Sequence, residues 1–525
     1  MTSLELPERL NAAEVFVDSH LDHGRETKAA VLCGDEVVTY GRLHENVNRM
    51  GNLLKKLGVR MEERVAILLP DSPACVYAFF GSMKVGAVAV PLNTMLKPKD
   101  YEYLLNDCRA RVLVVHSSLK PKIDEIRNEL RFLEHVLVDD DSAPGEQNLG
   151  AALKASEPKL EAAETSKDDM AFWLYSSGTT GFPKGTIHLH HDMIVEADLY
   201  AKRTIGVRED DVSFSVAKLF FAYGLGNGLY FPLRLGGMTV LLPDRPTPEK
   251  VYETIDRHQP TVYYGVPTSY AAMLHLAEKT GRDSLGRVRM CISAGEPLPS
   301  HLFEKWEERF GVQILDGIGS TEILHIFISN RPGNARPGST GQIVEGYEAK
   351  IVDDNGLEVP PRTVGTLLIK GDSIAAGYWN KHEQTKETFC GQWINTHDKF
   401  LVDESGFFWY AGRTDDMMKV SGQAVWPTDV EAVLQKHPAV LESGVVGVAD
   451  RDGLIKPCAY VVLKDGSEAS PELAKELQKF VKETTAPHKY PRAVVFVDEL
   501  PKTATGKIQR YRLRQIAATA TPFHE

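Results

Sequence analysis

The stretch YSSGTTGFPKG at residues 175–185 brings glycines, hydroxyl groups and one lysine together directly after the apolar run 171–174. Successive backbone N–H groups in a glycine-rich turn form a concavity for anions, and the Lys184 ammonium would add a positive charge. We therefore predict a phosphate-binding loop. Taken alone, such a stretch is more often a flexible surface loop.

The stretch also departs from the usual nucleotide-binding pattern G-x-x-x-x-G-K-[ST], which leads into a helix. Pro183 stands where the second glycine is expected, and neither Ser nor Thr follows Lys184. These two departures argue against a phosphotransferase that uses the loop as an ordinary kinase would.

Four further motifs follow in order: DGIGSTE (316–322), WINTHDKF (393–400), GRTDDMMKVSG (412–422) and PKTATGKIQR (501–510). Together with SSGTTGFPKG they resemble, over essentially the whole chain, the adenylate-forming superfamily of acyl-CoA synthetases, peptide-synthetase adenylation domains and luciferases. The resemblance implies that a carboxylate attacks the α-phosphate of ATP, that pyrophosphate leaves and that a thiol displaces AMP. It also implies Mg²⁺ as a cofactor. No carrier-protein segment follows residue 510, so free coenzyme A is the expected thiol.

The matching motifs carry expected roles residue by residue. Most of these side chains, taken singly, would be interpreted as solvated surface groups. The expected catalytic residues are Lys507, Glu322, Lys184 and Arg413. The β- and γ-phosphates are expected at Ser176, Ser177, Gly178, Thr179, Thr180 and Lys184, with Mg²⁺ near Thr180 and Glu322. The adenine and the α-phosphate are expected at Gly295, Glu296, Pro297, Asp316, Gly317, Ile318, Gly319, Ser320 and Thr321. The ribose hydroxyls are expected at Asp398, with Arg413 close to it.

The resemblance also implies a moving C-terminal domain. Asp415 matches the family's hinge, and a hinge needs only a few residues that absorb a change in φ and ψ. Rotation would withdraw Lys507, the expected bridge between the substrate carboxylate and the α-phosphate. It would bring in the residues expected to line the thiol tunnel, Lys419, Ser421 and Gly422. The chain departs from the family in one place, where the family's P-x-E is Pro427-Thr428-Asp429. The basic group Lys489, Tyr490 and Arg492 is either a contact for coenzyme A or solvated charge.

Two stretches bear on the acid, 217–232 and 316–330, and they closely resemble the benzoate–CoA ligase branch. Aromatic, aliphatic and small side chains suit a flat, neutral ring, although an aromatic cluster is as often plain core. His325 either packs only or hydrogen-bonds a ring substituent, which would favour 4-hydroxybenzoate or 2-aminobenzoate over benzoate. The matching pocket positions are Ala222, Tyr223, Gly224, His325 and Ile326. A non-catalytic nucleotide or acyl-CoA binding protein is the remote alternative, and the presence of all the expected charged residues opposes it.

The surrounding elements predict an α/β fold. The apolar run 65–69, the helix start at Ser72-Pro73 and the apolar run 88–92 form a βαβ unit, and such units build parallel sheets covered by helices. Further buried strands are expected at 111–116, 261–266, 288–295 and 312–319. Ligands collect at the carboxyl ends of such strands, so residues 293–296 and 316–322 mark the expected site.

The residue composition and hydrophobic pattern change after Pro332, where glycines and short alternating segments predict a small β-rich subdomain. Residues 428–431 (TDVE) are interpreted as a capping box that opens a helix, and a second helix is expected to start at Ser470-Pro471. We expect a large N-terminal domain of several subdomains, 1–414, that binds ATP and the acid. A small mobile α+β domain, 415–525, would carry Lys507 and the coenzyme A tunnel.

Composition limits the other possibilities. The chain has 525 residues, a formal net charge of −12 and a pI near 5.8, which argues against a general nucleic-acid or membrane-surface binder. No basic leader and no long apolar run is evident, and the six cysteines are scattered singly. A cytoplasmic protein with reduced thiols, acting as a monomer or homodimer on a small aromatic carboxylate, is therefore expected.

Overall fold

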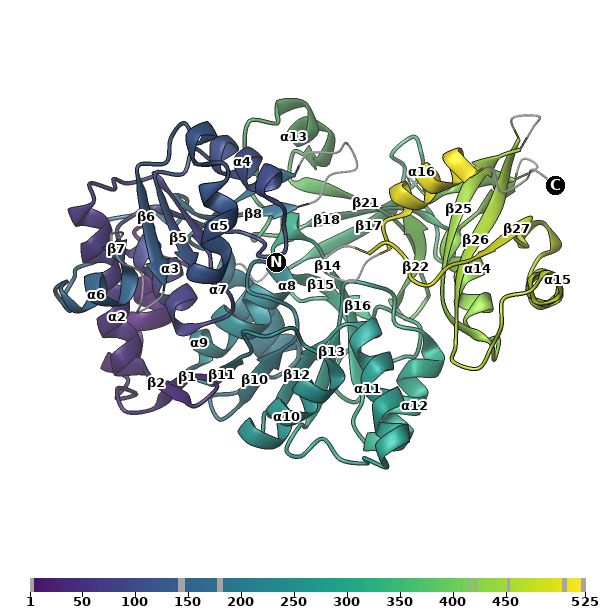
Figure 1. The fold of residues 1–525 in the computed structure, drawn as a ribbon, viewed down its shortest axis with the longest axis horizontal. Helices are drawn as coiled ribbons and strands as arrows, with labels where there is room; N and C mark the ends of the chain where they lie inside the picture. Colours follow the sequence, from purple (N-terminus) through teal and green to yellow (C-terminus); the bar gives the residue numbers. More distant parts are fainter. Residues whose placement is uncertain are drawn as a thin grey trace. The chain divides into compact units, whose positions relative to one another are not determined.

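The structure is a computed structural model that describes residues 4–139, 147–176, 183–413, 416–420, 423–450, 454–502 and 508–520. The chain forms two compact units, shown as ribbons in Figure 1. The larger unit comprises Met1–Glu348 and Ile369–Ile394, and the smaller comprises Ala349–Leu368 and Asn395–Glu525. The expected domain boundary at 414/415 lies inside the smaller unit and stays a prediction.

The larger unit is built on two sheets, each with a parallel centre. The first has eight strands, and its parallel pairs include β3 with β4, as the βαβ interpretation predicted. The antiparallel hairpin β8–β9 lies toward one edge. In spatial order the strands are β19 (Gly377–Tyr378), β9 (Lys184–Leu189), β8 (Met170–Ser176), β4 (Val88–Pro91), β3 (Arg64–Leu68), β5 (Val112–His116), β6 (His135–Asp139) and β7 (Gln147–Asn148).

The second sheet has nine strands and contains three of the four other strands expected from the sequence, while the expected strand 111–116 is β5 of the first sheet. Its central pairs are parallel, and β14 turns back antiparallel into β15. In spatial order the strands are β16 (Gln342–Ile343), β15 (Ile326–Ser329), β14 (Ile314–Gly319), β13 (Met290–Ser293), β12 (Val262–Gly265), β10 (Val212–Ser215), β11 (Met238–Leu241), β1 (Ala29–Cys33) and β2 (Glu36–Thr39).

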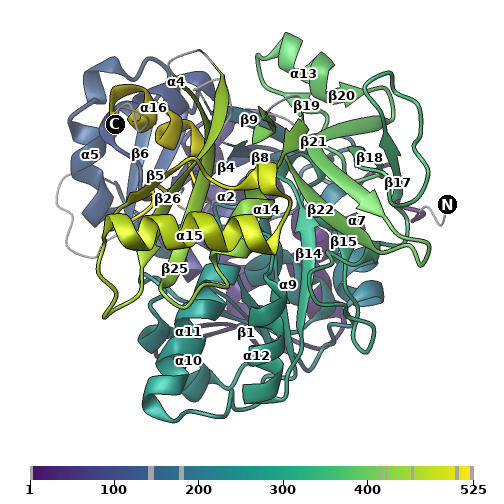
Figure 2. The same ribbon diagram turned by 90° about the vertical axis from the view of Figure 1, so that its right-hand side faces the viewer.

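Helices cover both sheets, and α10, α11 and α12 lie together over the second one in the two views of Figures 1 and 2. Trp306 of α12 and Tyr270 of α11 are fully buried in the core beneath them. Helix α3 begins as predicted, because the Ser72 hydroxyl accepts a hydrogen bond from the N–H of Cys75. The helices of this unit are α1 (Ser19–Asp22), α2 (Tyr40–Lys56), α3 (Pro73–Lys84), α4 (Pro98–Asp107), α5 (Lys120–Asp124), α6 (Leu149–Lys154), α7 (Asp192–Glu196), α8 (Ala222–Leu225), α9 (Phe231–Leu235), α10 (Pro248–His258), α11 (Pro267–Thr280), α12 (Ser300–Phe310) and α13 (His382–Thr388).

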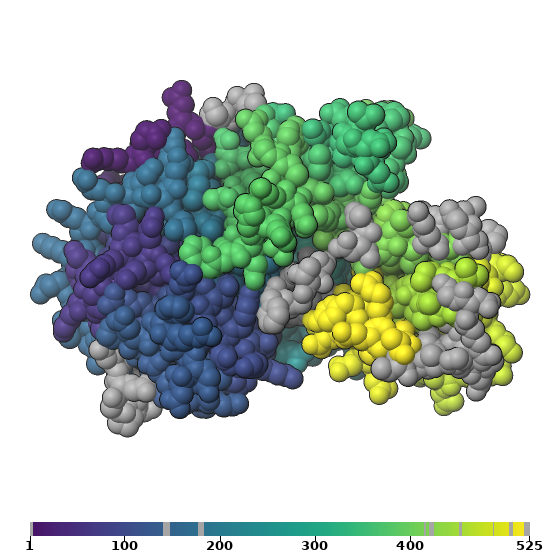
Figure 3. Space-filling model, turned by 90° about the horizontal axis from the view of Figure 1, so that it is seen from above, coloured from purple at the N-terminus to yellow at the C-terminus, as the bar shows by residue number. Residues whose placement is uncertain are grey.

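The segment 369–394 returns from the β-rich region to the first sheet. Its strand β19 pairs with β9, and the Trp379 ring lies 4.7 Å from the Trp173 ring. Figure 3 shows green residues of this part of the chain bordering blue residues from earlier in the same unit. This return places Tyr378 beside the strands that flank the expected phosphate loop.

The smaller unit holds the C-terminal α+β pattern that the sequence predicted. Strands β25 (Val440–Ala449), β26 (Ile455–Leu463) and β27 (Ala493–Phe496) form a three-stranded sheet. Its helices are α14 (Pro427–Leu434), α15 (Pro471–Thr484) and α16 (Arg510–Ala520). The chain's remaining strands lie in this unit or cross its boundaries, except β20 (Phe389–Cys390), which belongs to the larger unit: β17 (Glu348–Val352), β18 (Gly365–Lys370), β21 (Trp393–Val402), β22 (Phe408–Arg413), β23 (Met418–Val420) and β24 (Gln423–Val425).

One local prediction in this unit was wrong. Helix α14 starts at Pro427 with Trp426 as its N-cap, and no side chain caps it. Thr428 therefore opens no capping box. The Glu431 carboxylate instead accepts hydrogen bonds from the N–H of Val445 and from the Arg510 guanidinium. It is therefore engaged away from the N-terminus of the helix.

The cysteines are free thiols, of which Cys75, Cys108, Cys291 and Cys458 are buried. Across the described ranges, every helix is too short or too polar to cross a lipid bilayer.

Candidate active site

The hairpin β8–β9 presents both ends of the expected phosphate loop. Ser176 ends β8 and Lys184 begins β9, and the two lie directly opposite in the antiparallel register. The Tyr103 hydroxyl donates a hydrogen bond to the carbonyl oxygen of Pro183 at 3.0 Å, which fixes one end of the loop. The expected phosphate ligands between them, Ser177, Gly178, Thr179 and Thr180, lie outside the described residues.

Two strand ends of the second sheet meet at the same edge, as the parallel arrangement predicted. Ser293 at the end of β13 lies opposite Asp316 in β14. Burial raises the pKa of Asp316 well above its usual range, although the Ser293 hydroxyl and two backbone N–H groups oppose that shift. Among the expected nucleotide-binding positions next to them, Gly317 is buried. The others are at least partly exposed: Gly295, Glu296, Pro297, Ile318, Gly319, Ser320 and Thr321.

Glu322 follows this strand end and contacts the phosphate hairpin. Its Oε1 accepts hydrogen bonds from the Tyr378 hydroxyl at 2.9 Å and from the Ser176 hydroxyl at 3.4 Å. The Lys184 ammonium lies 4.2 Å from the centre of the Tyr378 ring, within the range of a cation–π contact. Tyr378 thus joins the expected metal ligand to the expected phosphate lysine. The sequence analysis missed Tyr378, because it stands 56 residues from Glu322 in a stretch with no motif.

The geometry at Glu322 fits a magnesium–nucleotide complex. Both of its side-chain hydrogen bonds to described residues fall on Oε1, so with respect to those residues the second carboxylate oxygen keeps lone pairs for a cation. Within the described ranges, no group of three or more His, Cys, Asp and Glu side chains is placed to hold a metal. Mg²⁺ in nucleotide sites is usually held by one or two carboxylates together with the substrate's phosphates, so a single glutamate suits it.

The expected acid-pocket residues come together on α8 and the start of β15. The Tyr223 hydroxyl donates to the carbonyl oxygens of Gly265 and Ile292, and its ring centre lies 5.4 Å from that of His325. A Cβ added at Gly224 would lie 2.1 Å from the carbonyl oxygen of Lys218, so only glycine fits there. Ala222 and Ile326 are buried beside these residues.

His325 does more than pack. Its Nε2 lies 3.1 Å from both the carbonyl oxygen of Tyr223 and the side-chain oxygen of Asn227, which makes Nε2 the protonated nitrogen. Burial lowers the pKa of His325 to about 3, so the ring is neutral at physiological pH. Its Nδ1 is a buried acceptor that no described residue satisfies.

In the smaller unit, Asp398 and Arg413 lie directly opposite in β21 and β22. Arg413 Nη1 is 3.3 Å from Asp398 Oδ1, and the Asp398 side chain is mostly buried. The structure therefore brings together the residues expected at the ribose. Lys507, Asp415, Ser421 and Gly422 lie outside the described residues, as does the side chain of Lys419.

The neighbourhood of the expected hinge is anchored to the last helix. Arg510 at the start of α16 donates two hydrogen bonds to Glu431, at 2.7 and 2.9 Å, and contacts Asp416 at 3.3 Å. Burial lowers the pKa of Arg510, but the charges of Glu431 and Asp416 raise it above its ordinary value. The basic group considered for coenzyme A is partly neutralised, because Lys489 pairs with Asp429.

Two protein-family models match this chain. The AMP-binding enzyme model matches residues 20–379, and the AMP-binding enzyme C-terminal domain model matches residues 429–507. A benzoate–CoA ligase of Thauera aromatica is 48% identical over 98% of this chain and 97% of its own length. A 4-hydroxybenzoate–CoA/benzoate–CoA ligase of Rhodopseudomonas palustris is 43% identical over 96% of this chain and 94% of its own. A crystal structure of an anthranilate CoA ligase with anthranoyl-AMP superposes with a TM-score of 0.94 at 45% identity, covering 98% of this chain and 99% of that one.

Proposed function

The chain belongs to the AMP-binding enzyme family, and on that premise we propose that it joins benzoate to coenzyme A through a benzoyl-adenylate. The reaction consumes ATP and releases AMP and pyrophosphate. The observation that carries the proposal is the 48% identity to a benzoate–CoA ligase along nearly the full length of both chains. The contact of Glu322 with Ser176 and Tyr378 supports it from the geometry.

The first step brings a carboxylate and a triphosphate together, so the protein has to neutralise repulsion between two anions. In the proposal Lys184 and the loop that begins at Ser176 hold the β- and γ-phosphates. Glu322 and Thr180 hold Mg²⁺, which supplies charge neutralisation when bound. Asp398 accepts from the ribose hydroxyls next to Arg413.

Lys507 has a separate role in the proposal. Its ammonium bridges the benzoate carboxylate and the α-phosphate during the first step. Movement at Asp415 then exchanges it for the segment with Lys419, Ser421 and Gly422, where coenzyme A reaches the acyl group. Removing a charge positioned in this way typically costs about 10²–10³ in rate.

The acid pocket favours an uncharged aromatic ring. Tyr223, His325 and Ile326 offer buried aromatic and aliphatic surface, and His325 itself is neutral because burial lowers its pKa to about 3. The Nδ1 of His325 is an acceptor that no described residue satisfies, which suits a ring that carries a hydroxyl or amino donor. Two alternatives therefore stand beside benzoate: 4-hydroxybenzoate, which one relative's name includes, and 2-aminobenzoate.

A ligation assay tests the proposal. Purified protein, ATP, Mg²⁺ and coenzyme A are incubated separately with benzoate, 4-hydroxybenzoate, 2-aminobenzoate and cyclohexanecarboxylate, and the acyl-CoA and AMP formed are quantified. The proposal expects equal amounts of benzoyl-CoA and AMP, with the highest kcat/KM for benzoate. A higher kcat/KM for 4-hydroxybenzoate or 2-aminobenzoate would identify that acid, and not benzoate, as the substrate. A higher kcat/KM for cyclohexanecarboxylate would contradict a pocket for an aromatic ring. The proposal also places the protein in the cytoplasm, as a monomer or homodimer.

A further inference from the structure

The turn that joins β14 to β15, residues 320–325 (the β14–β15 turn), carries two residues that belong to different parts of the site. Glu322 contacts the phosphate hairpin through Ser176, and His325 contacts the acid-pocket residue Tyr223. Only two residues separate them in the chain. A shift of this turn would therefore disturb the metal subsite and the acid pocket together.

The shape of the turn is not one that its own residues prefer. Leu324 has φ +78° and ψ −46°, close to a γ-turn conformation that is rare and strained for an L-residue with a branched side chain. Such a conformation persists only when surrounding groups hold it in place. The neighbours of the turn should therefore include groups that bind its backbone.

Those groups come from two separate segments of the larger unit, β9 and residues 373–375. His188 Nε2 of β9 lies 2.8 Å from the carbonyl oxygen of Thr321. The Ser373 hydroxyl donates to the carbonyl oxygen of Ile323 at 2.8 Å, and the N–H of Ala375 donates to that of Glu322 at 2.9 Å. These three contacts fall on the carbonyl oxygens of Thr321, Glu322 and Ile323, directly before strained Leu324. Glu196 at the end of α7 acts one step further out, because its Oε1 accepts from the Ser373 hydroxyl at 3.3 Å.

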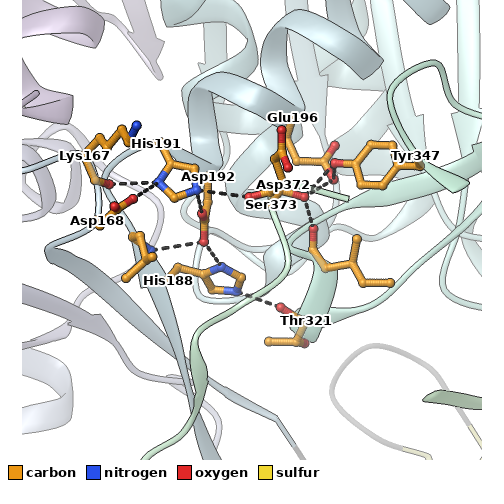
Figure 4. Close-up of polar contacts among 12 residues, drawn as sticks. Lys167, Asp168, His188, His191, Asp192, Glu196, Thr321, Tyr347, Asp372 and Ser373 are labelled. Atoms are coloured by element: carbon orange, nitrogen blue, oxygen red, sulfur yellow. Dashed lines mark hydrogen bonds and ion pairs between the residues drawn. The ribbon is translucent and has the colours of Figure 1, made fainter. Parts of the chain in front are cut away.

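The side chains that hold the turn are buried. They are fixed by further polar contacts, which Figure 4 shows. His188 Nδ1 lies 2.8 Å from Asp192 Oδ2. The Tyr347 hydroxyl donates to Glu196 Oε1 at 2.8 Å and also contacts the Ser373 hydroxyl. His188, Asp192, Glu196 and Ser373 are completely buried, so solvent cannot replace these contacts when one is lost.

We propose that His188 and Ser373 are positioning residues that clamp the β14–β15 turn, with Glu196 holding the Ser373 hydroxyl, and so place Glu322 at the metal subsite and His325 at the acid pocket as one unit. None of them touches a reacting atom in this account. The inference rests on the proposed function for its catalytic consequence, but not for its structural one. Outer groups that orient a metal ligand typically contribute about 10–100-fold to affinity or activity.

The structural consequence is tested without activity. Ser373→Ala removes the hydroxyl that holds Ile323, and His188→Leu removes the group that holds Thr321. Hydrogen exchange in peptides that cover 320–326 should become about tenfold faster in both variants. Ser82→Ala is the matched control, because Ser82 is also completely buried and its hydroxyl donates to the carbonyl oxygen of Ala78 at 2.7 Å. Unchanged exchange in the Ser373 variant would overturn the proposal.

The catalytic consequence is measured on the same proteins. In the Ser373 variant, we expect the Mg²⁺ concentration for half-maximal benzoyl-adenylate formation to rise about tenfold or more. At saturating supplied benzoyl-adenylate, release of benzoyl-CoA should change less than about twofold, because that step no longer involves pyrophosphate, whereas the displacement of His325 should raise the KM for benzoate. Equal loss in both steps, or a loss matched by Ser82→Ala, would mean that Ser373 only stabilises the fold. A wild-type protein that forms no adenylate would refute the proposed function, while faster exchange would still support the clamp.

Discussion

Replacing Glu196 with glutamine should change the pH dependence of stability in a direction that the structure fixes. The Glu196 carboxyl is completely buried, and burial raises its pKa from 4.5 to about 8, although hydrogen bonds from Tyr347 and Ser373 oppose the shift. The native protein therefore holds the Glu196 proton more tightly than the unfolded chain does. The stabilisation from that proton is complete below the unfolded pKa and is lost as the pH rises through about 8.

The expected size follows from the same shift. Between the two pKa values, each pH unit removes about 1.4 kcal/mol of the free energy of unfolding. From about pH 5.5 to about pH 7.5 the loss is on the order of 3 kcal/mol in the wild-type protein. The side-chain amide of the Glu196→Gln variant is neutral at every pH, and its oxygen can still accept from the Tyr347 hydroxyl. The variant should therefore lack this loss.

Urea unfolding followed by near-ultraviolet circular dichroism measures the effect. The quantity of interest is the difference in the free energy of unfolding between Glu196→Gln and the wild type at each pH, because it cancels all other titrating groups. We expect this difference to move in favour of the variant as the pH rises. Glu345→Gln is the control, since the Glu345 side chain is half exposed. A difference that stays constant with pH would show that Glu196 is ionised throughout, and would refute the reasoning.

Three further substitutions probe the proposed roles. Lys507→Ala should abolish formation of benzoyl-adenylate and leave thiolysis of supplied benzoyl-adenylate largely intact; equal loss of both steps would refute the division of labour. Asp398→Asn should raise the KM for ATP about 10–100-fold, since hydrogen bonds to a charged group contribute about 1.5–3 kcal/mol, and an unchanged KM would exclude the ribose contact. Arg510→Met should destabilise the smaller unit by about 3–5 kcal/mol, because it leaves buried Glu431 without its cation, while Asp416 keeps its contact with Arg514; calorimetry that shows no loss would contradict this.

Local signals allowed much of the fold to be predicted. The βαβ unit at β3, α3 and β4 was evident because apolar runs alternate with a helix that Ser72 caps, and these features act within a few residues. The expected strands ending at Ser293 and near Asp316 were confirmed as neighbours for the same reason. The prediction of a capping box at Thr428 was wrong, because the Glu431 carboxylate instead binds Arg510, 79 residues further along the chain.

The site was predicted only where it coincides with a motif. Glu322, Lys184, Asp398 and Arg413 stand in recognisable stretches, and the structure places the first two around one ring and the last two opposite each other. The clamp on the β14–β15 turn could not be predicted in this way. His188 and Thr321 are 133 residues apart, and hydrogen bonds across such a distance leave no periodic pattern in the sequence.

The central claim is that ATP is cleaved at the α-phosphate and releases pyrophosphate, and isotope exchange measures this cleavage directly. Wild-type protein is incubated with ATP, Mg²⁺ and labelled pyrophosphate, with and without benzoate, and in the absence of coenzyme A. We expect label to enter ATP only when benzoate is present, because reversible benzoyl-adenylate formation regenerates ATP from pyrophosphate. Benzoate-dependent release of ADP and inorganic phosphate, with no label in ATP, would contradict the account.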